Sequence, residues 1–132
     1  MATFEDLDAV ARSLPEVEAV LSSAGTPEYK VRGKAFLHMR APRKDAVDPD
    51  TGELMDDVLV FRTLGLAGKE EWLDDGSLPL FTTPHFNGWP AVLLRARDLG
   101  EVARDVLRHL IVDAWRAQAP KSLAKQLPEV KG

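Results

Sequence analysis

Cysteine is absent from this sequence of 132 residues, and so are long apolar runs. Without cysteine the chain has no disulfide, cysteine-type zinc site, redox motif or thiol nucleophile. The longest apolar runs, such as 91–94, fall far short of the roughly 20 residues that span a bilayer. The first ten residues also lack the basic and apolar regions of a secretory signal. We therefore expect a cytoplasmic protein without a membrane segment.

The composition is ordinary for a globular protein, with 45% hydrophobic and 29% charged residues. This length predicts one domain, 1–132, and a core that needs neither a metal nor a disulfide. The net charge of −4 is unevenly distributed. Segment 28–44 carries six basic and one acidic side chain, whereas 45–75 carries two basic and ten acidic ones. The chain as a whole should not bind polyanions non-specifically, but the two basic segments, 28–44 and 95–132, could form a local basic face.

Apolar residues at helical spacing predict helices at both ends of the chain. The first covers 4–13 and follows a capping box at Thr3 and Asp6. A short helix with Trp72 is predicted at 66–73, and the longest runs from Leu99 to Gln118 after an acidic capping box at 98 and 101. Residues 16–21 are predicted as a turn or helical extension, and 121–127 as one or two further helical turns.

Alternating apolar and polar residues predict a hairpin at 29–39 with Gly33 near its turn. A continuous apolar run at 58–61 predicts a strand that is buried on both faces or central, and 91–94 predicts a last strand that Pro90 opens. With helices at both ends, the expected fold class is α+β: two layers, an antiparallel sheet with the N- and C-terminal helices on one face. The other face is then expected to be open to solvent or a ligand.

The order of several short motifs resembles the MmcQ/YjbR family over nearly the whole chain. The motifs are Leu14-Pro15, Gly25-x-Pro27-x-Tyr29-x-Val31, Gly33-Lys34-x-Phe36, Thr83-Pro84-His85-Phe86-Asn87-Gly88-Trp89 and Pro120-Lys121. The resemblance implies a CyaY-like α+β fold, a small bacterial cytoplasmic protein and DNA binding through hairpins. Family members often have lysine or arginine between the asparagine and the tryptophan of the fourth motif, where this chain has Gly88.

The basic hairpin is the candidate nucleic-acid surface. Its cations would neutralise phosphates, and an exposed Phe36 would stack on a base. The alternative is a solvated sheet face whose charges serve solubility, with Phe36 packed under a loop. The candidate residues are Lys30, Arg32, Lys34, Phe36, Arg40, Arg43 and Lys44, with Lys121 and Lys125 as helpers near the C-terminus.

The segment with His85, Asn87 and Trp89 is the alternative ligand-binding site, for a small molecule or a protein partner. Its structural interpretation is a tight Asn-Gly turn anchored by the tryptophan.

The sequence predicts no metal site, no cofactor and no catalytic residue. The three histidines are scattered, the acids at 48–50 lack a third calcium ligand at the right spacing, and no serine has a nucleophile-elbow context. A binding module is therefore the expected function rather than an enzyme, and the sequence leaves the oligomeric state open.

Overall fold

The computed structural model describes residues 2–22, 25–40, 47, 51–55, 57–83, 86 and 88–125. None of the helices in these ranges is long and apolar enough to cross a membrane. The helices and strands follow in the order α1 (Phe4–Ser13), β1 (Val17–Leu21), β2 (Pro27–Val31), β3 (Lys34–Met39), β4 (Val58–Arg62), α2 (Gly65–Asp74), β5 (Ala91–Arg95), the 3₁₀ helix η2 (Ala96–Glu101), α3 (Arg104–Gln118) and α4 (Lys121–Ala124).

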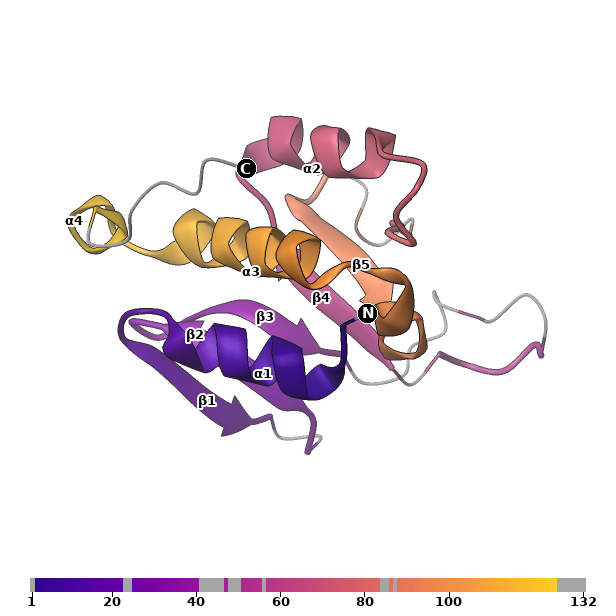
Figure 1. Cartoon of the computed structure of the whole chain (residues 1–132), viewed down its shortest axis with the longest axis horizontal. Helices are drawn as coiled ribbons and strands as arrows, with labels where there is room; N and C mark the ends of the chain where they lie inside the picture. The colour runs from indigo at the N-terminus through magenta and orange to yellow at the C-terminus, as the bar shows by residue number, and fades with distance from the viewer. Residues whose placement is uncertain are drawn as a thin grey trace.

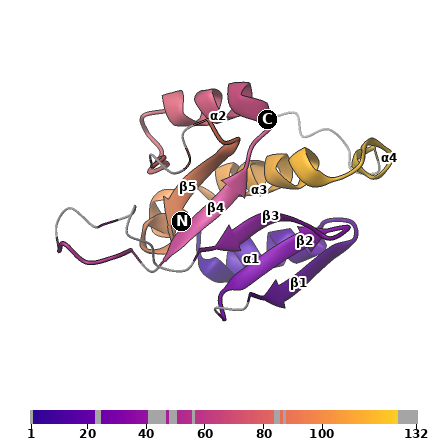
Figure 2. The same cartoon turned by 180° about the vertical axis from the view of Figure 1, so that it is seen from behind.

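The five strands form one antiparallel sheet in the order β1-β2-β3-β4-β5. Helices α1 and α3 lie side by side across one face of this sheet, and α2 lies beside α3 beyond the ends of β4 and β5 (Figure 1). The opposite face of β1, β2 and β3 is turned to the viewer in Figure 2, with no helix in front of it. The predicted α+β class and the placement of the terminal helices are confirmed.

The main core fills the space between the sheet and helices α1 and α3. Leu7 and Ala11 of α1 and Leu110, Ile111 and Trp115 of α3 are buried there against the sheet. The indole Nε1 of Trp115 donates a hydrogen bond to the Pro15 carbonyl at 3.1 Å. The predicted capping box of α1 is present, because Thr3 and Asp6 each bond to the other's backbone N–H.

A second apolar cluster lies on the other face of β4 and β5. Val58, Val60, Ala91 and Leu93 are buried there, and the partly buried Met55, Phe81 and Phe86 pack against them. Phe81 also forms an isolated antiparallel bridge with Leu93. The apolar run of β4 is therefore buried on both faces, as predicted, and the run of β5 is buried in the same way; β1, β2 and β3 leave their outer face uncovered by this cluster.

Two local predictions are wrong. Residues 17–21 form the edge strand β1 rather than a turn or helical extension, because Pro15 and the positive φ of Glu16 (56°) end the helical path and the chain then pairs with β2. The capping box at 98 and 101 is not formed: η2 occupies 96–101, and α3 begins at Arg104 without a side-chain cap. Leu99 and Val102 join the same core as α3, which explains why the apolar pattern looked continuous.

Candidate binding surfaces

The cations of the β2–β3 hairpin are largely compensated by nearby acids. Arg32 makes two hydrogen bonds to the Glu16 carboxylate, at 2.9 and 3.0 Å. Lys30 Nζ lies 3.8 Å from Glu28 Oε1, and its cross-strand neighbour on β1 is Glu18. Lys34 is exposed at the start of β3. This part of the surface carries mixed charge rather than a uniform positive strip.

Two of the predicted nucleic-acid residues do not reach the surface. Phe36 is 0% exposed, so the prediction that it stacks on a base is wrong. A β-bulge causes this: Tyr29 pairs with Leu37 and Lys30 with Ala35, which leaves Phe36 as the extra residue of β3 and places it in the core beside Leu37.

Arg40 is only 6% exposed, and its guanidinium lies over the Phe86 ring at 5.0 Å from the ring centroid. It therefore does not belong to an exposed basic strip. Arg43 and Lys44, the two remaining residues of the predicted surface, lie outside the described residues.

His38 lies in the middle of the outer sheet face, opposite Glu28 on β2 and Val60 on β4. Burial lowers the pKa of His38, while Glu28 acts to raise it and Arg40 to lower it further. An imidazole in this position favours the neutral form. It therefore adds little positive charge to the hairpin face at neutral pH.

Exposed cations gather instead at one end of the molecule. Gln118 Nε2, at the end of α3, donates a hydrogen bond to the Ala35 carbonyl at 2.9 Å, which brings the β2–β3 turn next to the C-terminal segment. Both views place this turn and α4 at the same end (Figures 1 and 2). Exposed Lys121 and Lys125 thus belong to the same end as Arg32 and Lys34.

Of the predicted loop site, Trp89 is described, whereas His85 and Asn87 lie outside the described residues. Trp89 is about half exposed, and the Arg62 guanidinium lies 4.9 Å from its ring centroid. Arg62 Nε is buried and has no hydrogen-bond partner within the described part of the chain. Burial lowers the pKa of Arg62. A stacked guanidinium with an unused Nε donor can donate a hydrogen bond to an anionic group.

Lys69 connects α2 to the loop residues Phe86 and Trp89. Its side chain is buried, with the residue 6% exposed. Its Nζ donates to the carbonyl oxygens of Phe86 at 2.6 Å and Trp89 at 2.8 Å. No ion pair to a carboxylate forms at Lys69 among the described residues. Burial without an opposite charge lowers the pKa of Lys69.

A cavity of about 320 Å³ opens beside Lys69, between α2 and the loop. Thr82 lines it, and the Thr82 Oγ1 is buried without a hydrogen-bond partner in the described part of the structure. The remaining lining combines apolar side chains with one acid and one loop glycine: Leu66, Leu73, Glu70 and Gly88.

Three large apolar side chains on the segments that form this cavity are about half exposed: Leu66, which lines it, and Leu64 and Trp89, which are close in sequence to the lining residues Leu66 and Gly88. Leu64 directly precedes α2, and Leu66 lies in its first turn. The Thr63 N–H donates to the Pro90 carbonyl at 2.9 Å, which holds this segment against the residue after Trp89. We call Leu64, Leu66 and Trp89 the apolar rim.

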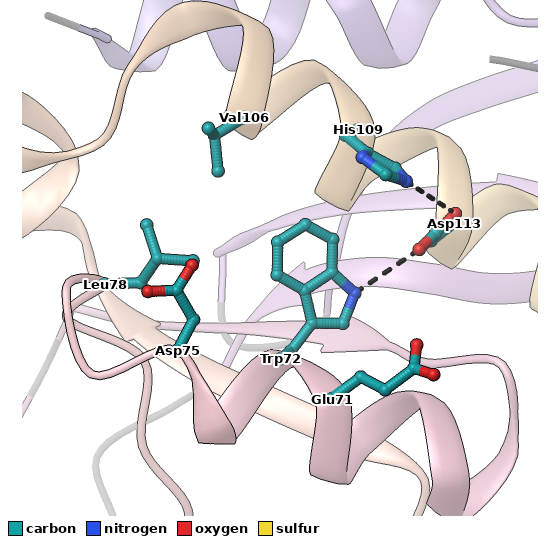
Figure 3. A pocket seen from close by; sticks show the side chains of 7 residues that line it. All are labelled: Glu71, Trp72, Asp75, Leu78, Val106, His109 and Asp113. Carbon is teal, nitrogen blue, oxygen red and sulfur yellow. Dashed lines mark hydrogen bonds and ion pairs between the residues drawn. The ribbon is translucent and has the colours of Figure 1, made fainter. Parts of the chain in front are cut away.

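A separate pocket of about 340 Å³ lies between α2 and α3 (Figure 3). Trp72 Nε1 donates to Asp113 Oδ2 at 3.3 Å, and His109 Nε2 lies 3.7 Å from Asp113 Oδ1. Burial raises the pKa of Asp113, while His109, the Trp72 hydrogen bond and Arg116 act to lower it. Among the residues that the structure describes, no group of three or more histidines and acids could hold a metal ion.

No sequence motif pointed to Arg62, Lys69 or Thr82 as site residues. Lys69 belongs to the charged run 69–71, which by itself does not single it out as a site residue. One signal could have located it: Leu66, Lys69 and Leu73 follow at a 3-4 spacing, so the lysine lies on the packed side of α2. Nothing in the local sequence marks Arg62 or Thr82, because their surroundings come from segments that fold against them.

The fold defines the protein as an α+β domain with an antiparallel five-stranded sheet and helices α1 and α3 on one face. An interhelical pocket and a loop cavity lie beside the sheet. The family model described as YjbR matches residues 12–117, and the chain belongs to this family. The expected family membership is thereby confirmed.

Relatives and a solved structure agree with this assignment. The uncharacterised proteins Rv2570 of Mycobacterium tuberculosis and Mb2600 of Mycobacterium bovis are each 32% identical over 134 residues, covering 95% of this chain and 95% of their own. The crystal structure of Deinococcus radiodurans protein DR2400, which has a domain named DUF419, matches with a TM-score of 0.58. That match covers 100% of this chain and 94% of the other at 19% identity, so it supports the fold alone.

Proposed function

We propose that this chain is a protein-interaction module that docks a peptide segment of a partner on the apolar rim. The observation that carries the proposal is the half exposure of three large apolar side chains, Leu64, Leu66 and Trp89, on two segments that the hydrogen bond from Thr63 N–H to the Pro90 carbonyl holds together. Clustered exposed apolar side chains on a soluble domain mark interaction sites, and tryptophan is enriched among residues that dominate binding energy.

Contacts under the rim support this role, because they hold its backbone in place before a partner arrives. Lys69 holds the carbonyl groups of Phe86 and Trp89, and the Arg62 guanidinium covers one part of the Trp89 ring. A surface that is ordered in advance loses less conformational entropy on binding. The nearby cations also favour a partner segment that combines apolar with acidic side chains.

Peptide selection followed by mapping tests the docking proposal. Peptides selected on the wild-type protein should shift amide NMR signals of Leu64, Leu66 and Gly88 and the indole signal of Trp89. Trp89→Ala should weaken the selected peptides at least about tenfold, a typical effect for a central tryptophan. Leu21→Ala is the matched control, because Leu21 is 72% exposed and lies on β1. If no peptide is enriched, or Trp89→Ala and Leu66→Ala leave affinity unchanged, the proposal fails.

A small molecule is the other occupant considered for the same loop. A thermal-shift screen of metabolites separates it from a peptide, because a ligand that binds only the folded state raises the melting temperature. Hits that Trp89→Ala abolishes, with no peptide enriched, would favour the small molecule.

Nucleic-acid binding is the second candidate function. Its surface would be the end of the molecule at the β2–β3 turn and α4, which carries the exposed residues Arg32, Lys34, Lys121 and Lys125. Its specific support is that two segments far apart in sequence bring exposed cations together. Against it stand the net charge of −4, the Arg32–Glu16 pair and the buried Phe36.

The salt dependence of duplex binding tests this second candidate. Each phosphate contact should steepen the fall of log K with log salt by about 0.9. Lys34→Glu combined with Lys121→Glu should flatten that slope and weaken binding. The double variant Arg104→Glu and Arg108→Glu makes the same charge change on exposed residues of α3. If both double variants bind duplex DNA with the same affinity, the surface that carries Lys34 and Lys121 is excluded as the DNA-binding site.

A further inference from the structure

The Lys69 ammonium has one more hydrogen-bond donor than the described part of the chain uses. An ammonium group carries three N–H donors, and two of them go to the Phe86 and Trp89 carbonyl oxygens. Both acceptors are neutral, so the positive charge is only partly compensated although the residue is more than nine-tenths buried. A buried charge without a counter-charge is unfavourable. An incoming anion would remove this deficit.

Thr82 supplies a second unused polar group to the same cavity. Its Oγ1 is buried without a partner in the described part of the structure, and a buried hydroxyl of this kind destabilises the fold unless something bonds to it. Two independent deficits, one at an ammonium and one at a hydroxyl, therefore line one cavity of about 320 Å³. Each would be satisfied by a group with two acceptor oxygens.

We propose that this cavity binds a carboxylate of the docked partner, with the Lys69 ammonium and the Thr82 hydroxyl as donors and the apolar rim holding the adjacent apolar side chain. This inference rests on the proposed docking function and names its ligand class. The carboxylate has acceptor oxygens for both donors, and its single negative charge matches the single ammonium.

Glu70 decides between a carboxylate and a phosphate. It lines the same cavity and is exposed, so its own negative charge lies at the opening. Repulsion from Glu70 acts on any anion, and it is larger for a phosphate monoester, which carries nearly two charges at neutral pH. The cavity therefore favours a monoanion. Leu66 and Leu73 line the remaining wall, which suits a carboxylate carried on an apolar side chain or backbone.

The test uses N-acetyl-L-leucine as the probe and N-acetyl-L-leucinamide as its uncharged counterpart, at constant ionic strength. The two probes share the apolar side chain and differ at the carboxylate. The backbone amide NMR signals of Thr82 and Gly88 should shift and saturate as N-acetyl-L-leucine is added. N-acetyl-L-leucinamide should bind at least about tenfold more weakly, because it cannot make the charge-assisted hydrogen bond.

Variants locate the donor groups. Lys69→Met keeps the length of the side chain and should abolish the preference for the acid, whereas Lys34→Met is the charge-matched control on β3 and should leave it intact. Thr82→Val removes only the hydroxyl and should weaken the acid several-fold. Glu70→Gln should tighten the acid by a smaller factor, because it removes the repulsion at the opening. If Lys69→Met does not fold, Thr82→Val and Glu70→Gln still test the same cavity.

The outcomes separate this inference from the docking proposal. If N-acetyl-L-leucine and N-acetyl-L-leucinamide bind equally well and both shift the NMR signals of Gly88 and Trp89, the carboxylate site is overturned and docking on the apolar rim remains. An acid preference that survives both Lys69→Met and Thr82→Val would place the anion elsewhere and also overturn it. Carboxylate binding without any peptide enriched would overturn the docking function. Failure of the acid to bind at concentrations of tens of millimolar would overturn the carboxylate site outright.

Discussion

The guanidinium of Arg62 lies 4.9 Å from the ring centroid of Trp89, and its Nε is buried without a hydrogen-bond partner among the described residues. A cation over an aromatic ring contributes about 0.5–1 kcal/mol, whereas a buried unpaired donor costs about 1–3 kcal/mol. The arrangement is therefore poor for stability taken by itself. We therefore propose that Arg62 takes part in binding at the proposed docking surface.

Replacing Arg62 by methionine should leave the free energy of unfolding unchanged or raise it by up to about 1 kcal/mol, because the unpaired donor is removed. Arg95→Met is the matched control on the neighbouring strand. Arg95 Nε donates to Asp57 Oδ1 at 2.8 Å, so losing it should lower the unfolding free energy by about 1–3 kcal/mol. Urea denaturation measures both. A loss of more than 1 kcal/mol for Arg62→Met would show that the arginine is structural.

Lys69 should make stability depend on pH in the alkaline range. Burial lowers its pKa in the folded state below the ordinary value of 10.5. The unfolded state then binds more protons, so stability should rise as pH increases through the folded pKa toward 10.5. Comparing urea midpoints of wild type and Lys69→Met from pH 7 to 10 checks this. The prediction fails if the two proteins show the same pH dependence.

Tyr29 Oη donates a hydrogen bond to Asp8 Oδ1 at 2.6 Å and so ties β2 to α1. Tyr29→Phe should lower the unfolding free energy by about 1–2 kcal/mol at neutral pH. The Tyr29 bond is the main factor that lowers the pKa of Asp8 below 3.8, and Arg12 also contributes. The stabilisation is therefore present above pH 3.8 and lost as pH falls through the lower folded pKa.

Measuring the free energy of unfolding at decreasing pH tests whether the Tyr29–Asp8 stabilisation is lost in acid. The gap between wild type and Tyr29→Phe should narrow as the pH is lowered below about 4, where Asp8 begins to bind a proton in the unfolded chain. A gap that stays constant down to pH 2 would mean that the phenol acts through packing alone.

Asp113, in the pocket between α2 and α3, is predicted to oppose stability when ionised. Burial raises its pKa above 3.8, so the folded state holds its proton more strongly and stability falls as pH rises from 3.8 through the folded pKa. Asp113→Asn retains an oxygen that can accept the Trp72 hydrogen bond. Asp113→Asn should therefore remove the decrease in stability with rising pH, and it should leave the free energy of unfolding at pH 7 unchanged within about 1 kcal/mol. Thermal unfolding of wild type and Asp113→Asn between about pH 3.5 and 7 measures this pH dependence. A loss of stability at pH 7 larger than about 1 kcal/mol in the variant would contradict the prediction.

Local signals in the sequence were enough for the elements that are stabilised locally. The Thr3–Asp6 capping box defines the start of α1, because the bonds that make it join residues three apart. Gly33, with φ of 83°, lies in the turn between β2 and β3, where a left-handed conformation favours glycine. The helical spacing of apolar residues up to Gln118 matches the buried face of α3. Family membership followed from motif order, which is also a property of the sequence.

The candidate site was decided by contacts between distant segments. Strand β1 exists because Val17–Leu21 pairs with β2, and Phe36 turns inward because a bulge breaks the alternation of β3. Lys69 is buried because the loop folds over it, and Arg62 meets Trp89 across 27 positions of sequence. Composition and spacing determine which side chains are present and how each helix or strand is patterned. Only the packing of the loop against α2 and the sheet removes water from Lys69, Arg62 and Thr82, and that desolvation turns ordinary polar residues into a candidate binding site.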